Sequence, residues 1–113
     1  MKKIEAVIRE EALTPLQKSL KQEGINPITA YRVQGRGRQG GIAYKWSEGI
    51  ESYDLLPRVK IELVVKDSDV EKVVNIITRV CRRGVPGDGK IFIIPVEDVI
   101  RVRTGERGVN AVT

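Results

Sequence analysis

The order in which strand and helix patterns follow one another is the feature that most constrains the fold of this chain. Four segments carry the two-residue period or the short apolar run of a strand, namely residues 2–9, 28–34, 58–65 and 91–94. A helical pattern follows the first and the third of them. The resulting order predicts an α+β fold of the ferredoxin-like type, with an antiparallel sheet and both helices on one face. The other face is left uncovered, which favours self-association.

Both predicted helices begin with a capping box, in which Ser or Thr precedes Glu or Gln by three residues. The first helix is expected from Thr14, which a proline follows, to just before Gly24. The second is expected from Ser68 to Gly84, with an apolar stripe at helical spacing. The stripe consists of Val70, Val73, Val74, Ile77, Val80 and Cys81. A short fifth strand is predicted near residues 99–102.

Length and composition limit what such a chain can do. At 113 residues it is expected to be a single domain, residues 1–113. It contains no histidine and one cysteine, so a disulfide framework, a zinc site and a Ser/His or Cys/His pair are not expected. No apolar run approaches the roughly 20 residues of a bilayer span, which predicts a cytoplasmic protein without direct membrane insertion. We therefore expect a binding or regulatory protein rather than an enzyme.

The net charge of +5 favours anionic partners. Nucleic acid is one candidate, because Arg36 and Arg38 lie among glycines and Tyr44 and Trp46 could stack on bases. Acidic residues are scattered through the whole chain, however, and no predicted helix carries a one-sided basic stripe. We expect no nucleic-acid partner.

A glycine-rich stretch near the C-terminus has the composition of a phosphate site. Residues 84–90 hold three glycines and end in Lys90, and three arginines follow between residues 101 and 107. Glycines let main-chain N–H groups approach an anion, and the cations neutralise its charge. The P-loop spacing is matched, but Ile91 stands where Ser or Thr would hold Mg²⁺, and the helix precedes the stretch instead of following it. A dinucleotide-type glycine pattern that starts at Gly35 also lacks its helix. A nucleotide site of another kind is predicted.

The segment of residues 37–56 is longer than a loop in a compact domain usually is. It contains Tyr44, Trp46 and Tyr53, three of the chain's five aromatic residues. Aromatic side chains on a long loop can anchor a partner protein, or they can fold back as a local cluster. Glycines at the base of the segment, the first of them Gly35, allow hinge motion. We predict a mobile, partner-binding loop.

Three blocks of sequence carry a resemblance to a known family: residues 35–39, 87–92 and 101–108. Over nearly its whole length the chain resembles the nitrogen regulatory PII signal transduction proteins. The resemblance implies a non-catalytic homotrimer that binds ATP and ADP in clefts between neighbouring subunits. It also implies that the loop of residues 37–56 docks on targets according to the bound nucleotide and 2-oxoglutarate. Such a target could be an ammonium transporter, a nitrogenase component or a metabolic enzyme.

The resemblance also assigns site residues, position by position. The nucleotide phosphates are assigned to Gly35, Gly37, Arg38, Gln39, Gly87, Asp88, Gly89 and Lys90 of one subunit. Arg101 and Arg103, in a C-terminal nucleotide-contacting segment of residues 101–113, are assigned to the same phosphates from the neighbour. The adenine is assigned to Thr29, Glu62 and Val64. Gln39 is expected to complete a Mg²⁺ shell shared by ATP and 2-oxoglutarate. The effector is assigned to Arg9, Gln39, Gly41, Arg58 and Gly87, and target binding to Tyr44, Trp46, Glu51 and Tyr53.

Two departures from the family pattern bear on regulation. Glu51 stands at the position of the family's uridylylated tyrosine, so this modification is not expected, and Tyr53 is not expected to replace it. Arg58 stands where lysine is usual, and its planar guanidinium can bind a carboxylate in a bidentate manner. These changes leave an alternative open, a PII-like adenine-nucleotide energy sensor that responds to a different small anion and serves a transporter or metabolic enzyme. Slow nucleotide hydrolysis that involves Asp88 is a third reading.

Overall fold

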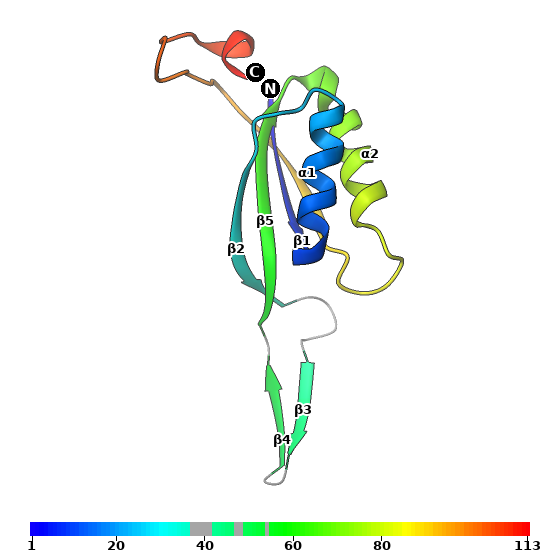
Figure 1. Ribbon diagram of the computed structural model, residues 1–113. Helices are drawn as coiled ribbons and strands as arrows, with labels where there is room; N and C mark the ends of the chain where they lie inside the picture. The colour runs from blue at the N-terminus through cyan, green and yellow to red at the C-terminus, as the bar shows by residue number, and fades with distance from the viewer. Residues whose placement is uncertain (37–41, 47–48, 54) are drawn as a thin grey trace.

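The computed structural model describes residues 1–36, 42–46, 49–53 and 55–113. Its main sheet has four strands in the order β2-β5-β1-β6, and each neighbouring pair is antiparallel. The strands are β1 (Lys2–Ile8), β2 (Thr29–Gly35), β5 (Leu56–Val65) and β6 (Lys90–Pro95). Helices α1 (Leu13–Gln22) and α2 (Val70–Cys81) cover one face of this sheet (Figure 1). The predicted ferredoxin-like α+β fold is confirmed.

The hydrophobic core lies between the two helices and one face of the sheet. Alternate residues of β1 and β5 face it in register, with Ile4 opposite Leu63 and Ala6 opposite Ile61, and all four are 4 % exposed or less. The helices contribute Leu16, Leu20, Val70, Val73, Ile76, Ile77 and Cys81. Burial of this apolar surface, at about 25 cal/mol per Å², holds the two layers together. The apolar stripe predicted for α2 did not include Ile76, which is buried. The residues that it did include are either buried or partly buried and packed against the core.

The predicted capping boxes are wrong. Each helix continues a short 3₁₀ turn, η1 (Glu10–Ala12) before α1 and η2 (Asp67–Asp69) before α2, and neither helix has a side-chain cap. Main-chain bonds close these turns, from Ala12 N to the Arg9 carbonyl and from Asp69 N to the Lys66 carbonyl. A turn that already satisfies main-chain donors removes the need for the predicted caps. No helix in the described part of the chain has the length and apolarity to cross a membrane.

Much of the segment predicted as a loop forms a β-hairpin. Strands β3 (Ile42–Trp46) and β4 (Gly49–Tyr53) pair antiparallel as a second, two-stranded sheet. Figure 1 shows this hairpin extending away from the end of the main sheet where β2 stops and β5 starts. Tyr44 pairs with Glu51 and Ile42 with Tyr53. The sequence analysis predicted one long loop for residues 37–56 and did not include these two strands, whereas the mobility of the segment stays a prediction.

The predicted fifth strand near residues 99–102 is also wrong. The chain turns back on itself there, with one isolated bridge between Ile100 and Arg107 and a hydrogen bond from Gly105 N to the Arg101 carbonyl. A 3₁₀ helix, η3 (Gly108–Ala111), follows. We call residues 98–108 the C-terminal turn. Its own main-chain contacts replace the strand pairing that the apolar run had suggested.

The face of the sheet away from the helices is uncovered in the single chain, but it is not simply apolar. Lys3, Glu5, Lys60 and Glu62 form a lattice of ion pairs across β1 and β5, with N···O distances of 2.9 to 3.9 Å. Exposed apolar side chains lie beside this lattice on the edge strand β6, where Phe92 is 48 % exposed and pairs with Glu5. We call this surface the open face.

Candidate functional site

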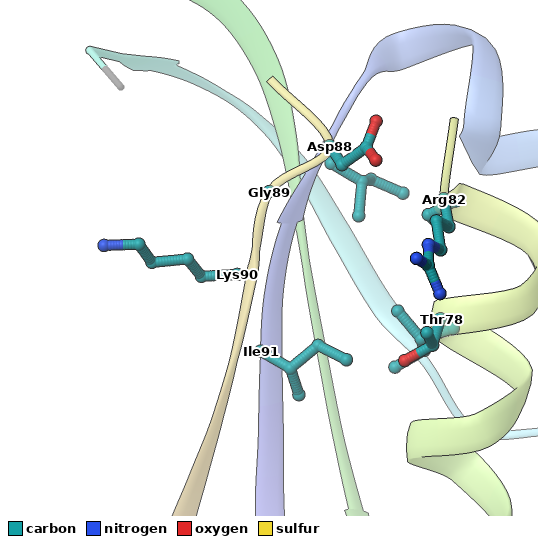
Figure 2. A pocket seen from close by; sticks show the side chains of 9 residues that line it. Thr78, Arg82, Asp88, Gly89, Lys90 and Ile91 are labelled. Atoms are coloured by element: carbon teal, nitrogen blue, oxygen red, sulfur yellow. The ribbon is translucent and has the colours of Figure 1, made fainter. Parts of the chain in front are cut away.

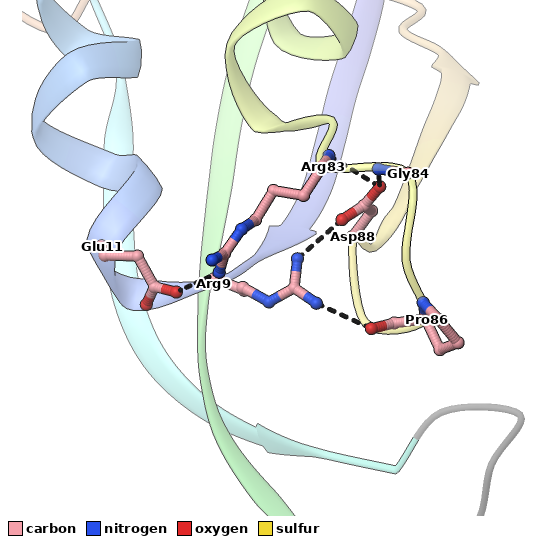
Figure 3. Close-up of polar contacts among 6 residues, drawn as sticks. All are labelled: Arg9, Glu11, Arg83, Gly84, Pro86 and Asp88. Carbon is pink, nitrogen blue, oxygen red and sulfur yellow. Dashed lines mark hydrogen bonds and ion pairs between the residues drawn. The ribbon is translucent and has the colours of Figure 1, made fainter.

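Asp88 closes the glycine-rich turn between α2 and β6. Its Oδ2 accepts hydrogen bonds from the main-chain N–H groups of Arg83 and Gly84, each at 2.9 Å, and its Oδ1 accepts one from Arg9 Nη1 at 2.6 Å (Figure 3). The N–H group of Arg83 above all, then Arg9 and Gly84, lower the pKa of Asp88 from 3.8 to about 2. The sequence analysis assigned this residue to nucleotide binding. In the structure both carboxylate oxygens accept hydrogen bonds that stabilise the turn.

Arg9 ties the turn to the end of β1. Its Nη2 donates to the Pro86 carbonyl at 2.7 Å, so one guanidinium holds both ends of the segment from Pro86 to Asp88. Arg83 adds a second link, an ion pair of 3.2 Å between its Nη1 and Glu11 (Figure 3). The turn is thus fixed to η1 and β1 by charged contacts, which favours a defined shape before any ligand arrives.

Two glycines of this turn are required by its geometry. Gly89 has φ +102°, and a Cβ there would lie 1.9 Å from the Val7 carbonyl oxygen. Gly87 has φ +97°, and a Cβ there would lie 2.8 Å from Arg9 Nη2 and 3.3 Å from Arg58 Nη2. Two guanidinium groups therefore approach the same point of the main chain. Among the described residues no carboxylate pairs with Arg58, so this point carries an excess of positive charge.

The predicted effector residues that the structure describes come together at this end of the sheet. Gly35 ends β2 opposite Leu56, and a Cβ on Gly35 would lie 3.9 Å from Arg58 Cγ. Arg9, Gly35, Arg58 and Gly87 thus form one cluster. The other residues assigned here, Gly37, Arg38, Gln39 and Gly41, lie outside the described residues. No group of three acidic, His or Cys side chains that could hold a metal occurs in the described ranges.

Lys90 lies on the open face rather than with the helices. It pairs with Val7, which also pairs with Lys60, and Figure 2 shows its side chain pointing away from a cavity on the helix side. That cavity, of about 290 Å³, lies between α2 and the start of β6 and is lined on the helix by Thr78, Cys81 and Arg82. Burial raises the pKa of the Cys81 thiol to about 11, so this thiol is unreactive.

The residues predicted to frame a base gather at the opposite end of the sheet. Thr29, Glu62 and Val64 line one cavity of about 250 Å³, together with Lys3 and residues of the C-terminal part. We call it the base pocket. The C-terminal lining residues are Val99, Ala111 and Val112. Ala111 and Val112 fall within the predicted C-terminal segment of residues 101–113, whereas sequence reasoning missed Val99 and Lys3. The register of Lys3 opposite Val64 could have been found from the strand pairing, whereas the fold of the C-terminal segment could not.

Glu62 is the most heavily contacted group of the base pocket. Tyr31 Oη donates to its Oε1 at 2.6 Å, and Lys3 Nζ lies 3.5 Å from its Oε2. Lys60 lies 3.9 Å from Oε1 and also sits 5.9 Å from the centre of the Tyr31 ring. The hydrogen bond to Glu62 raises the pKa of Tyr31, and Glu5 raises the pKa of both lysines. The pocket therefore has a carboxylate with one short hydrogen bond, from Tyr31, and two longer ion pairs.

Arg101 fastens the C-terminal residues beside the base pocket. Its Nη2 donates to the Asn110 carbonyl at 3.3 Å and to the main-chain oxygen of Thr113. Its Nε is buried and has no hydrogen-bond partner in the described part of the chain. Arg103, by contrast, is exposed at the tip of the C-terminal turn, next to Val102, which is 99 % exposed. Of the two arginines predicted to contact phosphate, Arg101 is therefore bound to main-chain oxygens of its own chain, whereas Arg103 is exposed.

One chain does not bring the two halves of the predicted site together. Arg58, near the glycine-rich turn, and Val64, in the base pocket, are six positions apart on β5, which corresponds to about 20 Å along a strand. The arginines of the C-terminal turn lie at the base-pocket end. The described site residues thus form a cationic, glycine-rich half and a base-pocket half, at opposite ends of the same sheet.

Comparison with known proteins identifies the family of this fold and site. The family model described as nitrogen regulatory protein P-II matches residues 1–106. The chain is 46 % identical to nitrogen regulatory protein P-II 2 of Methanothermobacter thermautotrophicus, over 99 % of this chain and 97 % of the relative. It is 44 % identical to nitrogen regulatory protein P-II of Azospirillum brasilense, over 99 % of this chain and 100 % of the relative. The chain belongs to the nitrogen regulatory P-II family and, like its members, is a non-catalytic signal-transduction regulator of nitrogen metabolism that interacts with target proteins.

Proposed function

We propose that this regulator binds ATP and ADP in the clefts of a homotrimer, senses 2-oxoglutarate beside ATP, and signals to its targets through residues 37–56. The observation that carries the proposal is the separation of the two half-sites. A nucleotide has a flat, weakly polar base at one end and a polyanion at the other, and each half-site suits one end. Two neighbouring copies would join the base pocket of one to the glycine-rich turn of the other.

The phosphate half is supported by charge and by main-chain geometry. The turn from Gly84 to Lys90 offers glycines at close approach, and Lys90 points from it onto the open face. Charge-assisted contacts of this kind contribute roughly 1.5–3 kcal/mol each when well formed. Arg103, exposed beside the fully exposed Val102, is available to a second copy. Coverage of this tip by a neighbour would also bury Val102.

The effector half is supported by the convergence of Arg9 and Arg58 at Gly87. A dicarboxylate such as 2-oxoglutarate supplies the anion that this excess of positive charge needs, and Arg58 can bind a carboxylate through two parallel hydrogen bonds. Mg²⁺ takes oxygen ligands and commonly keeps waters and phosphate oxygens in its shell. The amide oxygen of Gln39 suits this ion, so the chain itself would supply few ligands.

Signal transfer is supported by the position of the β3–β4 hairpin. Its base follows Gly35 and precedes Leu56, which are paired across β2 and β5 next to Arg58. A ligand shifts the posture of residues 37–56 only as far as it binds the two postures with different affinities. Contacts made at the base of the hairpin are well placed to provide that difference. A target such as an ammonium transporter, a nitrogenase component or a metabolic enzyme would then contact Tyr44, Trp46 and their neighbours.

Titration calorimetry tests the nucleotide sites. We expect ATP and ADP to bind, and Lys90→Ala and Arg103→Ala each to weaken ATP binding by about tenfold or more, the effect of losing one charge-assisted contact. Lys18→Ala, which removes an exposed cation from α1, is the matched control and should leave binding unchanged. Equal affinity in all four proteins would refute the site assignment. Sedimentation of the same samples tests the trimer.

A second candidate function is favoured by Arg58. In this alternative the chain is an energy sensor that binds ATP and ADP with a different small anion and serves a transporter or metabolic enzyme. Repeating the titrations with saturating 2-oxoglutarate separates the two. Tighter binding of ATP but not ADP supports the nitrogen and carbon sensor. Nucleotide affinity that does not respond to 2-oxoglutarate supports the energy sensor.

A further inference from the structure

Tyr31 extends the ion-pair lattice of the open face to the edge strand β2. It pairs with Lys60 in the register of β2 and β5, while Thr29 pairs with Glu62. Its hydroxyl reaches diagonally to Glu62 Oε1 at 2.6 Å, the shortest contact made to that carboxylate. Lys60 also contacts the ring, with its Nζ 5.9 Å from the ring centre. Tyr31 is thus ordered by two contacts although it is 41 % exposed.

The hydrogen bond from Tyr31 makes the two oxygens of the Glu62 carboxylate different from each other. Oε1 accepts from the hydroxyl, whereas among the described residues Oε2 has only Lys3 at 3.5 Å, a lysine that lies closer to Glu5, at 2.9 Å. Oε2 is therefore the oxygen with the greater remaining acceptor capacity. Thr29 and Val64 line the same pocket. A carboxylate in this state accepts hydrogen bonds and donates none.

We propose that Tyr31 is a positioning residue for base selectivity: its hydroxyl fixes Glu62 as an acceptor in the base pocket, which favours adenine over guanine. The proposal rests on the nucleotide function proposed above. Adenine carries an amino group that donates at the position where guanine carries a carbonyl that only accepts. A fixed carboxylate binds the first and repels the second. Without the hydroxyl, the carboxylate is free to turn towards the two lysines, and its preference is weakened.

Calorimetric titration of ATP and of GTP, each with Mg²⁺, into the full chain tests this inference. We expect the wild-type protein to prefer ATP by about tenfold or more, because a fixed hydrogen-bond acceptor rejects a base that presents an acceptor, rather than a donor, at the same position. Tyr31→Phe keeps the ring and its contact with Lys60 but removes the hydroxyl, and should lower the ATP-to-GTP affinity ratio about fivefold. Glu62→Gln, whose amide can present either a donor or an acceptor, should bring the ratio close to one.

The ratio separates positioning from a general structural effect, since a loosened subunit would lose affinity for both nucleotides alike. Thr14→Val, which removes an exposed hydroxyl from α1, is the matched control and should keep the wild-type ratio. An unchanged ratio in Tyr31→Phe, or no preference in the wild-type protein, overturns this inference while leaving nucleotide binding intact. A wild-type protein that binds neither nucleotide overturns the proposed function, and this inference with it.

Discussion

Replacement of Gly89 by alanine should destabilise the chain more than any other glycine substitution in the described loops. The added Cβ would lie 1.9 Å from the Val7 carbonyl oxygen, far inside contact distance. Val7 lies on the central strand β1 and pairs with Lys60 on one side and Lys90 on the other. The oxygen cannot retreat without disturbing a strand that is paired along both edges.

The expected magnitude follows from two contributions. A residue other than glycine at φ +102° is strained, and such strain costs about 1–3 kcal/mol. Moving the Val7 carbonyl costs about 0.5–1.5 kcal/mol for each ladder hydrogen bond that is weakened. Together they amount to roughly 3 kcal/mol, a large part of the 5–15 kcal/mol that stabilises a typical domain. Urea unfolding followed by circular dichroism, at one fixed protein concentration, measures this loss.

Gly24→Ala provides the matched control. Gly24 also has a left-handed φ, +79°, but a Cβ there would meet nothing within 4 Å. Its substitution should therefore show the conformational cost alone, about 1–2 kcal/mol. A Gly89→Ala variant that loses no more stability than Gly24→Ala would refute the reasoning, because the close approach to Val7 would then be energetically irrelevant.

Two further predictions concern titratable groups. Because the pKa of Asp88 is depressed to about 2, its contribution to stability is fully present above its unfolded pKa of about 4 and is lost as the pH falls towards 2. Urea midpoints measured from pH 6 to pH 2 should therefore differ between wild type and Asp88→Asn at neutral pH and converge in acid, and a constant difference would contradict this. Cys81, with a pKa raised to about 11, should react with iodoacetamide at pH 8 far more slowly in the folded chain than in urea. Equal rates, followed by mass spectrometry, would show that the thiol is not buried as described.

The main elements were predictable because the buried face and the strand period coincide. Ile4, Ala6 and Ile8 alternate along β1, and all three are buried as the period of two requires. Helix starts were less predictable. Thr14 and Ser68 fit the capping pattern, but each helix is preceded by a 3₁₀ turn and has no side-chain cap. The β3–β4 hairpin was missed because two five-residue strands in a glycine-rich context carry little periodic signal.

The candidate site was predictable in its residue types but not in its layout. The three glycines of residues 84–90 and Lys90 predict an anion site, and the structure adds that a side chain at position 89 would meet the Val7 carbonyl. Asp88 shows the limit of such reasoning. A carboxylate in a glycine-rich stretch cannot be assigned from sequence to a ligand or to the turn, because the choice depends on Arg9, which is 79 positions away. The division of the site between two ends of the sheet depends on strand register in the same way.

The register of β2 and β5 links the site to the projecting hairpin. Gly35 and Leu56 are the last pair of the main sheet at this end, and both hairpin strands lie between them in the sequence. Arg58, two residues inside this pair, has its Cγ 3.9 Å from the Cβ position of Gly35 and its Nη2 3.3 Å from that of Gly87. The anion that we propose for Arg58 and Arg9 would therefore bind beside this last pair of the main sheet.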